Sequence, residues 1–125
     1  MMAISQADDS SENTGIDLVI ARIRKDFIAR LIERSLMLES LKAEVTSSQQ
    51  PERAISAIGE MAHKMAGVAA TLGLQRLGKL SMQLDDLIGS ARSSGQAASQ
   101  TWLIAEGAVE DLLDEMEALL DQSES

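Results

Sequence analysis

The sequence predicts an all-α fold, an antiparallel four-helix bundle of up-down-up-down topology with a disordered N-terminal tail. Apolar residues recur along most of the chain at spacings of three and four, which is the period of a helix. They are mainly Leu, Ile, Ala, Val and Met, and only Phe27 and Trp102 are aromatic. Pro51 is the single proline in 125 residues, as expected for long helices. No strand pattern occurs, and the length suits one domain.

The N-terminal third is expected to contain a polar tail and one long helix. Residues 1–13 are acidic and low in hydrophobicity, which is typical of a disordered segment. Thr14 and Asp17 can form a capping box that begins a helix over residues 16–45. The apolar stripe of this helix consists of Ile20, Ile23, Phe27, Leu31, Leu38, Leu41 and Val45.

Three further helices are predicted, so that the bundle occupies residues 14–121. Pro51 suits the start of a helix over residues 51–72, and Gly73 suits the left-handed residue that ends it. Helices over residues 74–91 and 99–120 follow, joined by the polar loop 92–96, and an acidic tail is expected over residues 122–125. The apolar stripes are Ile55, Ile58, Ala62, Met65, Ala69 and Leu72, then Leu77, Leu80, Leu84, Leu87 and Ile88, then Trp102, Ala105, Val109, Leu112, Met116 and Leu119.

The composition argues against several classes of function. A formal net charge of −9 disfavours binding to nucleic acid or to an anionic membrane surface. Cysteine is absent and histidine occurs once, so neither a disulfide framework nor an ordinary metal site is expected. No apolar run approaches the roughly 20 residues of a membrane span, and residues 1–13 lack the features of a signal peptide. We therefore expect a cytoplasmic protein, and its polar ends favour a stand-alone chain.

His63, the only histidine, is the most informative residue for function. On a helix it shares one face with Ala66, Gly67 and Ala70, which are all small. The imidazole should therefore stand clear of its neighbours and be open to a second protein. A core histidine would have bulky neighbours instead, and a metal site would have further ligands nearby. Since neutral imidazole is a nucleophile near pH 7, the pattern indicates a reactive surface histidine.

The segment from residue 63 to residue 85 resembles the histidine-containing phosphotransfer (HPt) domain. That family is marked by a histidine, a glycine four positions later, Leu-Gly near the helix end, and leucines closing with Leu-Glu. The matching residues here are His63, Gly67, Leu72, Gly73, Leu77, Leu80, Leu84 and Asp85. The order of the predicted helices also matches. The resemblance implies a four-helix bundle that acts in a two-component multistep phosphorelay.

The resemblance also implies the chemistry and the partners. His63 would take a phosphoryl group from the aspartate of a receiver domain of a response regulator and pass it to another. The donor could instead be a sensor histidine kinase, possibly a hybrid one. The protein would be a covalent phosphocarrier and not an enzyme. It would have no nucleotide site and no cofactor of its own, because the receiver supplies Mg²⁺.

Several residues near His63 have supporting roles by the same resemblance. Asp85 stands where the family often carries Glu or Gln, and it could fix the imidazole tautomer directly or through water. Gly67 leaves room for the phosphoryl group and for the partner's loops. Lys64 and Lys79 are candidate cations beside the phosphate. The family often has lysine three positions after the histidine, where this chain has Ala66, so Lys64 could serve in its place only in part.

We expect receivers to dock on the face of the second and third predicted helices centred on His63. The expected docking residues are Gly59, Ala66, Gly67 and Ala70, with Lys64 and Lys79 among the nearby charges. Charged outer faces on every helix predict a monomer.

Other interpretations of the sequence remain open. One is a non-catalytic helical interaction module with an incidental histidine, and another is a bundle that binds receivers without accepting phosphate. The dimerisation helices of a histidine kinase would normally have an acid after the histidine, where this chain has Lys64. A phosphotransfer domain cut from a longer chemotaxis kinase is a further possibility.

Overall fold

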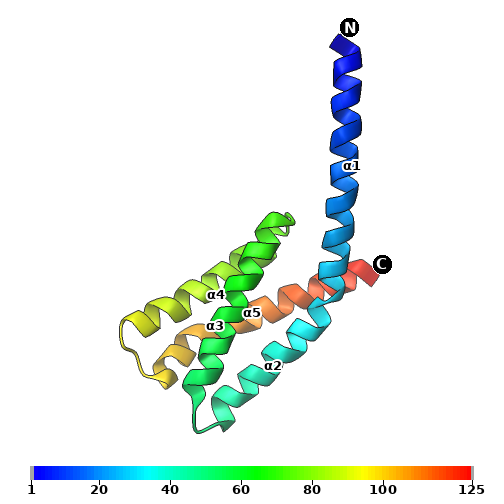
Figure 1. The fold of residues 1–125 in the computed structure, drawn as a ribbon. Helices are drawn as coiled ribbons and strands as arrows, with labels where there is room; N and C mark the ends of the chain where they lie inside the picture. Colours follow the sequence, from blue (N-terminus) through cyan, green and yellow to red (C-terminus); the bar gives the residue numbers. More distant parts are fainter. Residues whose placement is uncertain (1, 125) are drawn as a thin grey trace.

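The computed structural model describes the backbone of residues 2–124 and the side chains of residues 15–123. It contains five helices: α1 (Met2–Ala29), α2 (Leu31–Ser47), α3 (Pro51–Thr71), α4 (Gln75–Ser93) and α5 (Ala98–Glu124). No strand occurs in this part of the chain. Helices α2 to α5 pack around one core and are joined by short loops, while α1 projects from one end of the bundle (Figure 1). The predicted all-α four-helix bundle is confirmed.

The predicted first helix over residues 16–45 is wrong in one respect, because the structure divides it at Arg30. The Arg30 N–H is shared between the carbonyls of Asp26, at 3.2 Å, and Phe27, at 3.1 Å. Such a shared bond tightens the last turn of α1, and the chain bends before α2 begins. Phe27 and Leu31 on either side of the bend are both buried, so the apolar stripe continues through it.

Helices α1 and α5 extend over residues that the sequence analysis assigned to the two tails. Residues 2–13, expected as a disordered tail, lie within α1, and α5 continues through most of the expected tail at 122–125. A helix that is already nucleated by packing can extend into polar residues, since each added residue gains one hydrogen bond. The side chains of residues 1–14 lie outside the described part, so the division into a tail and a bundle at residue 14 stays a prediction.

The core contains most of the predicted stripes of the four helices, but Ile23, which was predicted as part of the first stripe, is 50% exposed. Leu31 and Leu38 of α2, Ile58 of α3, and Leu84 and Leu112 of α4 and α5 have no or almost no exposed surface. The remaining large buried side chains include Phe27, Val45, Ile55, Met65, Leu72, Leu77, Ile88, Trp102, Val109 and Met116. The polar surface adds cross-links between helices, including an ion pair of Lys42 with Glu110 and one of Arg76 with Glu115.

The end of α3 follows the predicted glycine cap. Gly73 has φ = 72°, a left-handed conformation that glycine adopts without steric cost. The Leu74 N–H donates to the carbonyl of Ala69 at 2.9 Å, and the Gly73 N–H donates to that of Ala70 at 3.3 Å. This tight turn brings α4 back along α3.

Glycines on facing sides let α3 and α4 approach closely. A Cβ atom at Gly59 of α3 would lie 3.2 Å from Cγ2 of Ile88. A Cβ atom at Gly78 of α4 would lie 3.5 Å from Cβ of Ala69 and 3.7 Å from the backbone nitrogen of Ala70. The two helices therefore pack nearly backbone to backbone, which determines how side chains on their shared outer edge meet.

Candidate functional site

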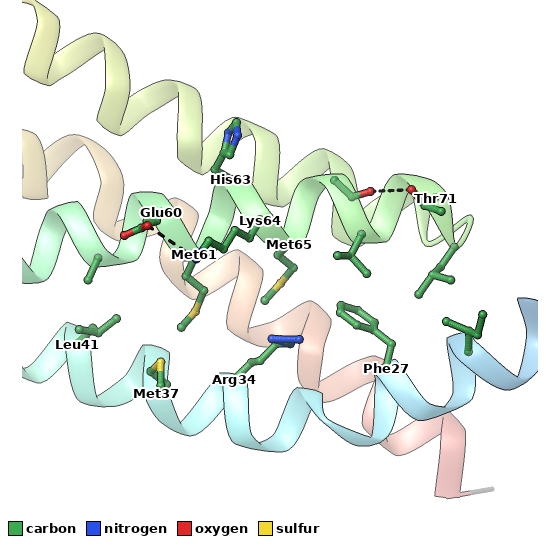
Figure 2. Close-up of a pocket in the computed structure, with 15 residues that line it drawn as sticks. Phe27, Arg34, Met37, Leu41, Glu60, Met61, His63, Lys64, Met65 and Thr71 are labelled. Atoms are coloured by element: carbon green, nitrogen blue, oxygen red, sulfur yellow. Dashed lines mark hydrogen bonds and ion pairs between the residues drawn. The ribbon is translucent and has the colours of Figure 1, made fainter.

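His63 lies near the middle of α3 and is one of the most accessible side chains of the bundle. Its side chain is 77% exposed. Figure 2 shows the imidazole on the outer side of α3, pointing away from the α1 and α2 helices. The small neighbours Gly67 and Ala70 are exposed beside it. The predicted accessibility of the ring agrees with this geometry.

Asp85 of α4 contacts the imidazole directly. Its Oδ2 lies 2.9 Å from Nδ1 of His63, and its side chain is only 33% exposed. A carboxylate accepts hydrogen bonds, so in this contact Nδ1 carries the proton and donates the hydrogen bond. The other nitrogen, Nε2, then has its lone pair available on the exposed side of the ring. The question left open by the sequence, a direct or a water-mediated contact, is resolved in the structure as a direct one.

The short aspartate reaches His63 because α3 and α4 pack closely. Asp85 lies on the same side of α4 as Gly78, two turns earlier, and Gly78 faces Ala69 and Ala70. The longer side chain of glutamate would be needed at position 85 to reach His63 only if the helices were farther apart. The packing role of Gly78 was not predicted, and the signal that could have revealed it is a glycine within a helix at the edge of the Leu77–Leu84 stripe.

Gly67 follows His63 by one turn and opens the surface. A Cβ atom there would meet no atom within 4 Å, so internal packing does not require a glycine. A glycine in a helix interior costs up to about 1 kcal/mol relative to alanine. Its place beside His63 is therefore consistent with a need for clearance at the surface.

The two candidate lysines are placed less specifically. Lys64 lies 3.8 Å from Glu60 in an i,i+4 pair in which both side chains are largely exposed (Figure 2). Lys79 is exposed on α4. Among the described residues, no hydrogen bond or ion pair joins either lysine to His63.

Two residues of the predicted docking surface are in the wrong place. Gly59 is buried against Ile88, and Ala66 is only 9% exposed, facing α4 near Gly78. Small residues at these positions serve the close contact of α3 with α4 and do not form an outer patch. Gly67 and Ala70 remain on the exposed face, and Lys64, which directly follows His63, is exposed as well.

A groove that the sequence analysis missed runs along α3, and His63, Lys64 and Gly67 are among the residues that line it. Its volume is about 1020 Å³, and it runs between α3 and the α1–α2 helices (Figure 2). Arg34 points into it, with the guanidinium carbon 5.2 Å from the centre of the Phe27 ring. The Arg34 Nε is buried and has no hydrogen-bond partner. The remaining apolar lining includes Ile23, Met37, Leu41, Met61, Met65 and Val68.

Two further findings concern metals and membranes. Among the described residues, no group of three or more His, Cys, Asp or Glu side chains is arranged to hold a metal ion. Within the same residues, no helix combines the length and the apolar character needed to cross a bilayer.

The fold and the site define a helical bundle that presents one imidazole to the outside, with a carboxylate on its Nδ1. A family model described as the Hpt domain matches residues 22–123, so the chain belongs to the Hpt domain family. This membership assigns the protein to the histidine phosphotransfer modules of phosphorelays, whose partners are receiver domains and histidine kinases. No curated protein and no solved structure matches the chain significantly.

Proposed function

We propose that this protein carries a phosphoryl group on Nε2 of His63, between the aspartates of receiver domains or from a histidine kinase to a receiver. The observation that carries the proposal is the contact of Nδ1 with Asp85 in an otherwise exposed ring. It favours the tautomer in which Nε2 is free to act as a nucleophile. Family membership supports the same reaction.

The transfer step is a displacement at phosphorus. The Nε2 lone pair forms a bond to the phosphorus of an aspartyl phosphate, and the bond from phosphorus to the aspartate oxygen breaks. The aspartate leaves as a carboxylate. Nδ1 keeps its proton throughout, and Asp85 stabilises the positive charge that develops on the ring as the N–P bond forms. In the reverse direction a receiver aspartate attacks the phosphohistidine.

We propose that the partner supplies the rest of the chemistry. The exposed face around His63 holds no cluster of metal-binding side chains among the described residues, and Lys64 is paired with Glu60. The charge of the phosphoryl group would therefore be neutralised largely by the receiver and its Mg²⁺. The protein acts as a carrier in the cytoplasm, where receivers are found, and not as an enzyme.

The test is incubation with a receiver domain that has been phosphorylated with a small-molecule phosphodonor. Label that is stable in base and labile in acid should appear on the protein, and His63→Gln should abolish it without loss of helical circular dichroism. Labelling that persists in His63→Gln would reject the proposal. Binding of the receiver without any labelling would instead favour the alternative, a non-catalytic receiver-binding module.

A further inference from the structure

The groove along α3 is continuous with the exposed face that carries His63. Because a helix turns by about 100° per residue, Gly67 and Lys64 lie about 40° and about 100° from His63 around α3. Val68 follows about 40° farther on, and these four residues are exposed and line the groove. Met37 of α2 lines the opposite wall and is 58% exposed. A protein that reaches the imidazole from this side therefore covers the groove as well.

Arg34 brings an unpaired positive charge into this groove. Of the other charged residues in the lining, Glu60 and Lys64 lie 3.8 Å apart and pair with each other. Within the described structure, the Nε of Arg34 is buried without a hydrogen-bond partner, and the guanidinium lies over the ring of Phe27. The guanidinium points into the groove (Figure 2), where its terminal nitrogens are not buried. A buried polar group without a partner in the free protein is suited to a partner that arrives with a docked protein.

The charge of Arg34 contrasts with the rest of the molecule. The formal net charge is −9, and α5 carries acids but no Lys or Arg. An acidic side chain of a docking protein would therefore be repelled over most of the surface and attracted at Arg34. The guanidinium has parallel N–H groups that match the two oxygens of a carboxylate. The apolar walls around it, which include Phe27, Met37 and Val68, would exclude water from such a pair and strengthen it.

We propose that Arg34 determines which receivers the protein accepts, by binding a carboxylate that a cognate receiver places in the groove. The phosphorylated aspartate of the same receiver faces His63, and apolar side chains of the receiver cover the groove around the carboxylate. Arg34 contacts no reacting atom, so it is a specificity-determining residue and not a catalytic one. This inference rests on the proposed function, because the occupant of the groove is the receiver that exchanges phosphate with His63.

The test is binding of the receiver domain that labels the protein in the transfer experiment. Calorimetry in a His63→Gln background measures its Kd with no phosphate transferred. Arg34→Met keeps an apolar stem over Phe27 and should weaken binding about tenfold, with a melting temperature close to that of the parent. Arg22→Met is the matched control, because Arg22 is exposed on α1 outside the groove lining and loses the same charge. It should change the Kd less than twofold.

A second pair of variants tests the groove itself. Met37→Asp should weaken binding at least tenfold, because the new carboxylate competes for Arg34 and is costly to bury in an apolar contact. Leu36→Asp is its control, since Leu36 is the neighbouring residue of α2, is 65% exposed and does not line the groove. Its Kd should stay within twofold of the parent value.

The carboxylate is identified by replacing the exposed acids of the receiver with amides, one at a time. One replacement should weaken binding to the parent protein about tenfold and leave binding to Arg34→Met unchanged, which is the coupling expected of two groups in direct contact. If Arg34 served only to pack on Phe27, no acid of the receiver would be coupled to it.

The inference is overturned if Arg34→Met binds as tightly as the parent, if Arg22→Met weakens binding equally, or if no receiver acid is coupled to Arg34. Equal effects of Met37→Asp and Leu36→Asp would place the docked receiver outside the groove and overturn it too. In each of these cases, labelling of His63 would still support the proposed function. A protein that no receiver labels or binds would overturn the proposed function, and this inference with it.

Discussion

The reactivity proposed for His63 depends on a single contact, because only Asp85 holds the imidazole in the described structure. The rest of the ring is exposed. An exposed imidazole without a partner samples both tautomers and several rotamers, and only a fraction of them presents Nε2 outward. In the proposed function, the carboxylate of Asp85 selects the productive tautomer and orients the ring, so that Asp85 acts as a positioning residue.

The first prediction is that Asp85→Ala slows phosphotransfer roughly three- to tenfold. A partly exposed hydrogen bond to a charged group contributes up to about 1.4 kcal/mol, and this corresponds to a factor of ten in rate. The ¹⁵N shifts of the imidazole should show a mixture of tautomers in the variant. In the wild type, Nδ1 should carry the proton at neutral pH.

Asp86→Asn provides the matched control for this substitution. Asp86 is an exposed neighbour on α4 that does not contact His63. Its substitution removes the same charge as the substitution of Asp85. It should leave both the rate and the ¹⁵N shifts nearly unchanged. Equal effects of the two substitutions would mean that overall charge, and not positioning, controls the rate.

The second prediction separates clearance from stability at Gly67. Gly67→Gln should stabilise the protein by up to about 1 kcal/mol in urea unfolding, because glutamine is the better helix former and no atom lies within 4 Å. Transfer from the receiver should nevertheless slow strongly, because the new side chain projects beside His63. Gly107→Gln on α5, where a Cβ atom also meets nothing within 4 Å, should stabilise similarly and leave transfer unchanged. Normal transfer in Gly67→Gln would show that the receiver docks elsewhere.

At the scale of helices, the distance between α3 and α4 determines whether an acidic side chain as short as aspartate can reach His63. The close approach at Gly59 and Gly78 brings Asp85 within hydrogen-bonding distance of His63. Packing of two glycine-bearing helix faces is thus part of the site. A larger separation would require a longer acid on α4.

The third prediction tests this packing at Gly78. Gly78→Leu should destabilise the bundle by about 1–3 kcal/mol, because the added side chain meets Ala69 and the backbone at Ala70. It should also break the His63–Asp85 contact, which ¹⁵N shifts of the imidazole would report. Gly78→Ala makes only ordinary contacts at 3.5 Å and should be neutral or slightly stabilising. A Leu variant as stable as the Ala variant would show that the helices are free to move apart.

The sequence was sufficient to predict the four packed helices and the exposure of His63. Helical spacing of apolar residues located the four packed helices, and Gly73 located the end of α3. The bend at Arg30 was not predictable, because the apolar stripe runs through it and its cause is a shared backbone hydrogen bond. Gly59 and Ala66 were placed on the surface because a small residue can either clear a surface or admit a neighbouring helix, and the sequence alone does not distinguish the two.

At the scale of the whole molecule, the charges are unevenly distributed. The formal net charge is −9, and α5 carries eight acidic residues without a single Lys or Arg. Only two of these acids, Glu110 and Glu115, form ion pairs with cations of neighbouring helices among the described residues, leaving aside Asp121. The glutamate partner raises the pKa of Lys42, so the Lys42–Glu110 pair persists well above neutral pH. Repulsion within α5 should therefore outweigh the attraction of these exposed pairs, which are individually weak.

The fourth prediction is that salt stabilises this protein. Raising sodium chloride from about 0.02 M to about 0.5 M shortens the screening length several-fold and weakens repulsion between exposed acids. We expect the melting temperature to rise by about 2–5 °C, which for a domain of this size corresponds to about 0.5–1 kcal/mol. The double variant Asp114→Asn, Glu117→Gln removes two exposed acids of α5 and should show a smaller rise, with a higher melting temperature at low salt. A melting temperature that falls with salt would mean that the pairs Lys42–Glu110 and Arg76–Glu115 contribute more than the repulsion within α5.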